Sequence, residues 1–120
     1  MVTSASNAWN GELVRAWLQH RFAASRLDQA AADRRGYTAQ DDYDKAAAEE
    51  WVCSALKTAA WTNDQAALAK RLKDLIAQDD YQATGIYDDR RFERHVRGYL
   101  RTLAKMTKAN EGFDKTLRYQ

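Results

Sequence analysis

The chain has 120 residues, 45% of them hydrophobic, with four Trp, five Gly and no Pro. Its 19 Lys and Arg against 17 Asp and Glu leave a formal net charge of only +2. Disordered segments are rich in proline and poor in aromatic residues, so this composition excludes a disordered chain. A chain of this length forms one hydrophobic core, and we expect a single helical-bundle domain over residues 1–120.

The alanine-rich, proline-free sequence predicts an all-α fold: a compact bundle of four main helices with a short C-terminal tail. The first helix is expected at about Ala8–Arg34, with Gly36 as its stop. Besides its main apolar row, this helix carries a second one, formed by Val14, Leu18 and Phe22. The second row indicates either a central helix that is buried on two sides or a protein interface.

Capping motifs predict where the next two helices begin. Thr38, with an acidic residue three positions later, is typical of a capping box for a second helix at about Ala39–Ala60. Thr62 and Gln65 repeat this pattern before a third helix at about Asn63–Gln78.

A loop over Asp79–Tyr87 precedes a fourth helix, which Asp88 is expected to cap. This helix reaches about Asn110, and Gly112 ends it. The tail that follows is too short to assign, but we expect its apolar side chains to fold back on the bundle: Phe113, Leu117 and Tyr119.

The fourth helix carries two stripes on opposite faces. Wound at 100° per residue, its apolar residues between Phe92 and Met106 cluster on one side, the expected core face. Opposite them, within an arc of about 80°, lie only cations and no acidic residue. We call this set the basic stripe: Arg90, Arg94, Arg97, Arg101, Lys105 and Lys108.

Repulsion between the cations of the basic stripe destabilises the helix, whereas a helix face of mixed charge avoids this repulsion. Like charges four residues apart destabilise a helix by a few tenths of a kcal/mol per pair. The stripe extends over about 27 Å in steps of roughly 5 to 6 Å, which is comparable to the spacing of phosphates along a strand. Arginine also suits bidentate phosphate contact. We therefore predict that the stripe contacts the backbone of RNA or single-stranded DNA without sequence specificity.

Two other interpretations of the basic stripe stay open: a solvated face, or a face that pairs with an acidic protein surface. The chain itself offers such a surface, within the fold or in another copy, in Asp41, Asp42, Asp44, Glu49 and Glu50. The charge distribution favours nucleic acid, because residues 1–89 carry 10 cations and 14 anions whereas residues 90–120 carry 9 and 3.

Residues for catalysis or metal binding are scarce. Neither His20 nor His95 has a second His three or four residues away, and Cys53 lies among apolar neighbours that indicate a buried thiol. Phosphate-binding loops and nucleophile elbows are missing. We expect no enzymatic activity, catalytic residue, metal or cofactor. Without a signal-like start or an apolar run of membrane length, we expect a cytoplasmic protein with no membrane partner.

A short, all-helical chain with one cationic helix face and no catalytic residues resembles the small subunits of multi-subunit CRISPR effector complexes. The resemblance implies a non-catalytic subunit of an antiviral ribonucleoprotein complex, which stacks on other protein subunits, including copies of itself. It also implies that the basic stripe lines the path of a bound strand and that Val14, Leu18 and Phe22 form a stacking contact. The alternative is a phage or plasmid anti-defence or adaptor protein that acts by protein–protein binding.

Overall fold

The computed structural model describes residues 8–114 of the chain. In chain order its elements are α2 (Gly11–Arg35), the 3-10 turn η1 (Gly36–Ala39), α3 (Gln40–Leu56), α4 (Ala59–Thr62), α5 (Gln65–Ile76) and α6 (Asp89–Ala109). No strand occurs between residues 8 and 114, and the predicted all-α fold is confirmed. None of the helices in this part of the chain is long and apolar enough to cross a membrane.

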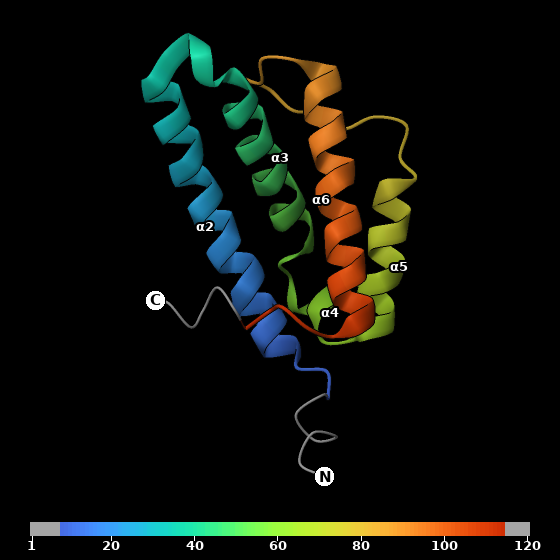
Figure 1. Cartoon of the computed structure of the whole chain (residues 1–120). Helices are drawn as coiled ribbons and strands as arrows, with labels where there is room; N and C mark the ends of the chain where they lie inside the picture. Colours follow the sequence, from blue (N-terminus) through green and yellow to red (C-terminus); the bar gives the residue numbers. More distant parts are fainter. Residues whose placement is uncertain (1–7, 115–120) are drawn as a thin grey trace.

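The four long helices lie side by side in the order α2, α3, α6, α5 (Figure 1). The chain runs up α2 and down α3, then up α5 and down α6, so that α3 and α6 are parallel neighbours. This arrangement arises because the segment with α4 carries the chain from the end of α3 to the start of α5, so that α6 returns between them (Figure 1). As a result the N-terminal ends of α3 and α6 lie next to each other.

The core is made of aliphatic side chains from all four long helices. The apolar face of α6 supplies Phe92, Val96, Leu100 and Leu103, each at most 2% exposed, so the predicted core face is confirmed. Against it pack buried residues of the other three helices: Val14, Leu18, Val52, Leu56, Leu68, Leu72 and Leu75. Their burial removes most of the apolar surface of each helix from water, which is the main favourable contribution to folding.

The second apolar row of α2 belongs largely to this core. Val14 and Leu18 are each 1% exposed, so the predicted protein interface is wrong for these two side chains. The predicted central position is also wrong, because α2 lies at one edge of the row of helices, beside α3 (Figure 1). Phe22, one turn further, is half-buried, and the ammonium group of Lys57 lies 3.6 Å from the centre of its ring. The row therefore packs one face of α2 against the bundle, where no partner can reach Val14 or Leu18.

Two predicted helix ends are confirmed. Asp88 caps α6, because its carboxylate accepts a hydrogen bond from the backbone N–H of Arg91 at 3.0 Å. Gly36 ends α2 with a φ of +77°, and its N–H reaches back to the carbonyl groups of the last turn. The positive φ explains the glycine at this position.

Both predicted capping boxes are wrong. Thr38 lies within η1, and no side chain caps the N-terminus of α3. Thr62 instead closes the short helix α4, where its hydroxyl donates to the carbonyl oxygen of Thr58 at 3.2 Å. Asp64 caps α5 instead, because its carboxylate accepts hydrogen bonds from the backbone N–H groups of Ala66 and Ala67. Asp and Thr are both good caps, and tertiary packing decides between them.

The start of the tail folds back as expected. Phe113 is 3% exposed and packs edge-on against Trp9 and Trp17, with ring centres 5.8 and 5.5 Å apart. Leu117 and Tyr119 lie outside the described residues. Cys53 is fully buried, and burial raises the pKa of its thiol to about 12. The prediction of a buried thiol is confirmed, and the thiol stays protonated at neutral pH.

Candidate nucleic-acid interface

Five of the six cations of the basic stripe are exposed on the face of α6 that points away from the core. They are Arg90, Arg94, Arg101, Lys105 and Lys108. Within residues 8–114, none of these five forms an ion pair or a side-chain hydrogen bond. Their charges are therefore available to a ligand along the whole length of α6.

Arg97 is used inside the fold. Its guanidinium donates to the backbone oxygen of Gln78 at 2.9 Å and to the carboxylate of Glu93 at 3.3 Å, and lies 4.9 Å from the centre of the Tyr81 ring. Tyr81 is itself buried, with its hydroxyl donating to the carbonyl oxygen of Leu75 at 2.6 Å. Arg97 thus fastens the loop after α5 to α6, and we do not count it among the free cations.

Replacing Arg97 by Gln is expected to lower the free energy of unfolding by about 1–2 kcal/mol, because charge-assisted hydrogen bonds and a cation–π contact are lost together. The matched change Arg101→Gln, one turn along the same stripe, should stay within about 0.5 kcal/mol because Arg101 is exposed and unpaired. Urea unfolding of both variants measures the difference. Equal values for the two would show that Arg97 is not a structural tie.

A buried carboxylate fixes the N-terminal end of the basic helix. Asp44 on α3 is 0% exposed and accepts hydrogen bonds from the backbone N–H groups of Tyr87 and Asp88 at 2.8 and 3.0 Å. It also forms an ion pair with Arg91 at 2.8 Å. Because α3 and α6 are parallel, the acidic first turns of α3 meet the partly positive start of α6. The buried carboxylate of Asp44 therefore links α3 to the N-terminal end of α6.

The predicted acidic surface on α3 is neutralised by other cations than those of the basic stripe. Each acid has its own partner in the fold: Asp41 with His95 and Arg91, Asp42 with Arg35, Asp44 with Arg91, Glu49 with Arg21, and Glu50 with Arg26. The idea that the stripe pairs with this surface inside the fold is therefore wrong. Its use by another copy is also disfavoured, because these carboxylates already have partners.

A hydrogen bond between the ring Nε2 of His95 and the carboxylate of Asp41, at 2.9 Å, makes a pH-dependent contact between α6 and α3. The hydrogen bond to His95 lowers the pKa of Asp41 from its ordinary value of 3.8. A lowered folded-state pKa means that this contact stabilises the fold above about pH 3.8 and is lost as the pH falls through the folded-state pKa.

In a carboxyl NMR titration, we expect His95→Ala to raise the pKa of Asp41 toward 3.8. The pKa of Asp88, which the backbone N–H of Arg91 lowers, should not move and serves as the control. An unchanged pKa of Asp41 in the variant would show that His95 is not its main partner.

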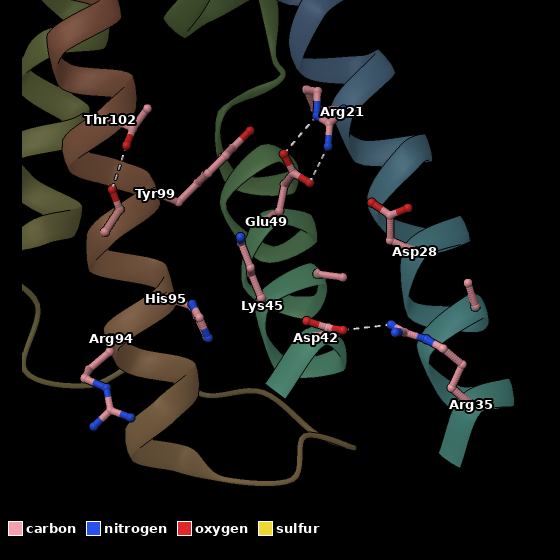
Figure 2. A pocket seen from close by; sticks show the side chains of 13 residues that line it. Arg21, Asp28, Arg35, Asp42, Lys45, Glu49, Arg94, His95, Tyr99 and Thr102 are labelled. Atoms are coloured by element: carbon pink, nitrogen blue, oxygen red, sulfur yellow. Dashed lines mark hydrogen bonds and ion pairs between the residues drawn. The ribbon is translucent and has the colours of Figure 1, made fainter. Parts of the chain in front are cut away.

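A groove of about 710 Å³ runs beside the basic stripe, over α3 and between α2 and α6 (Figure 2). It exists because small residues face it from two helices, Ala46 on α3 and Gly98 on α6. Arg94 of the stripe and Lys45 of α3 are among its lining residues. Arg94 lies at its edge, with its guanidinium turned away from α3 (Figure 2). Sequence patterns did not predict this groove, since it depends on α3 and α6 being neighbours.

No family model, curated protein or solved structure matches this chain. The charge and geometry of the residues themselves therefore carry the functional proposal.

Proposed function

We propose that this protein binds the sugar–phosphate backbone of RNA or single-stranded DNA along α6, as a non-catalytic component of a nucleoprotein assembly. One observation supports the proposal above all: five exposed cations follow one helix face, and none is paired within residues 8–114. Five such cations in a row repel one another, and phosphates relieve this repulsion while they release counterions.

The rest of the fold supports this role by fixing α6 in place. Asp44 and Asp41 hold its N-terminal part to α3, and Arg97 holds its middle to the loop after α5. A helix fixed on both sides presents its cations from a rigid backbone, so only side-chain freedom is lost when a strand binds. The contacts to phosphates alone carry no base information, so binding along the stripe is independent of sequence.

The competing role is an adaptor or anti-defence protein that presents the basic stripe to an acidic protein. A second copy of this chain is a poor candidate for that surface, because the carboxylates of α3 are paired internally. The place in a CRISPR effector complex stays a prediction. Co-purification of the expressed protein with RNA, seen in its absorbance spectrum, is the test of that prediction.

Fluorescence anisotropy with labelled oligouridine and oligothymidine of about ten nucleotides tests the proposed function. At physiological salt we expect both strands to bind with dissociation constants of roughly 1–100 μM, the range of sequence-independent binding, and more tightly at low salt. Polyglutamate of matched charge serves as a competitor that imitates an acidic protein. Displacement of either strand should need a large excess of it. Binding of polyglutamate without binding of either strand would contradict the proposal and favour the adaptor role.

A further inference from the structure

The two edges of the basic stripe differ in a way that decides where a strand can extend. Toward α5, the stripe meets the carboxylate of Glu93 and the loop that Arg97 fastens, which carries two exposed acids, Asp79 and Asp80. Toward α3, it opens at Arg94 into the groove between α2 and α6. A polyanionic strand is repelled at the first edge and admitted at the second.

Most of the acids that line the groove are neutralised from within it. Arg21 binds Glu49 through two hydrogen bonds, at 2.8 and 2.9 Å, and Arg35 binds Asp42 at 2.8 Å (Figure 2). The remaining carboxylate, Asp28, is outnumbered by Lys45 and Arg94, which form no ion pair in the described part of the chain. The groove therefore has no excess of negative charge that would keep a nucleotide out.

The groove is also lined by one aromatic side chain, Tyr99, whose hydroxyl lies 3.6 Å from the sulfur of the buried Cys53. Tyr99 extends from α6 toward α3, next to the opening left by Gly98, and is half-buried (Figure 2). Burial raises the pKa of its hydroxyl, so the phenol stays neutral and does not repel phosphates. At Gly98, which also lines the groove, an added Cβ atom would meet no heavy atom within 4 Å, so the space in front of this glycine is open. A cavity of about 710 Å³ lies within the usual range for sites that hold small organic ligands.

We infer that this groove takes up a base of a single strand whose phosphates lie on the basic stripe, with Tyr99 as the aromatic contact and Arg94 and Lys45 at the adjoining phosphate. This inference rests on the proposed function and adds to it a direction: the bases turn toward α3, away from α5. Bases stack on aromatic rings irrespective of their identity, so the site stays independent of sequence. It also requires bases that are free of a partner strand, because paired bases are stacked within a duplex.

An abasic strand separates this inference from the proposed function. We expect an abasic DNA strand of about ten sugar–phosphate units to bind at least about fivefold more weakly than oligothymidine of the same length. Equal binding of the two strands would overturn the groove as a base site and leave backbone binding intact. Failure of both strands to bind would overturn the proposed function itself.

A larger side chain that fills the groove tests whether the base is bound there. Gly98→Leu places a side chain into open space and should reduce the affinity for oligothymidine at least about fivefold, to that of the abasic strand, without changing the affinity for the abasic strand. Gly98→Ala, which leaves most of the space empty, is the matched control and should behave like the unmodified protein. Unchanged oligothymidine binding by a folded Gly98→Leu variant, or equal weakening of both strands, would overturn the inference.

Discussion

Replacing Asp44 with Ala is expected to lower the free energy of unfolding by about 3–5 kcal/mol, the usual effect of removing one partner of a buried ion pair. The change leaves Arg91 with only the longer contact to Asp41, at 3.5 Å, and leaves the amides of Tyr87 and Asp88 without their acceptor. Small domains are stable by about 5–15 kcal/mol in total, so this loss is a large share of the stability of the fold. Urea denaturation followed by circular dichroism measures the effect.

Asp42→Ala is the matched control, since it removes a carboxylate two residues away on the same helix. Asp42 and its partner Arg35 are more than half exposed, at 57% and 59% of their side chains, and such pairs contribute at most about 1 kcal/mol. A loss in Asp44→Ala no larger than in Asp42→Ala would show that the junction of α3 and α6 does not depend on the buried charge.

Reversing the three central charges of the basic stripe, with Arg94, Arg101 and Lys105 all changed to Glu, is expected to weaken binding of single-stranded oligonucleotides at least about hundredfold. The change removes three of five phosphate contacts and adds three repulsive charges beside the strand. The fold should remain, because all three side chains are exposed and the repulsion within α6 is relieved. Fluorescence anisotropy gives the affinity, and thermal unfolding checks the fold.

A second triple variant separates the place of the charges from their number. Arg34, Lys70 and Lys73 are exposed on α2 and α5, so changing these three to Glu alters the net charge by the same amount away from the stripe. We expect this control to lose much less affinity than the stripe variant. Equal losses in the two triple variants would show that net charge alone governs binding, and the stripe would then not be an interface.

The four long helices could be predicted from sequence because each signal is local. The apolar face of α6 repeats at helical spacing, and its observed bounds, Asp89–Ala109, begin directly after the predicted cap Asp88 and end one residue before the predicted Asn110. The predicted second helix was too long, because α3 ends at Leu56 and α4 is a separate turn. Thr38 and Thr62 are good capping residues in isolation, but neither caps a helix once the bundle is packed.

The basic stripe could likewise be predicted from the spacing of its cations along the helix. Which of these cations are free and which are paired in the fold could not be predicted. Arg97 has the same character as Arg101 in the sequence, and only the packing of Tyr81 and the loop after α5 distinguishes them. Asp44 looked like one of several solvated acids, because its burial requires the parallel contact of α3 with α6. That contact depends on the segment with α4, which places α5 on the far side of α6, and no sequence pattern predicted this path.

The salt dependence of single-strand binding tests most directly whether α6 binds phosphates. For single strands the logarithm of the affinity falls with the logarithm of the salt concentration by about 0.7 for each phosphate that is neutralised. With five free cations we expect a slope of about −3 to −3.5 for the unmodified protein. The triple change of Arg94, Arg101 and Lys105 to Glu should reduce the slope to about −1.5 or less. No binding at low salt, or a slope that is the same with and without these three cations, would contradict the proposed interface.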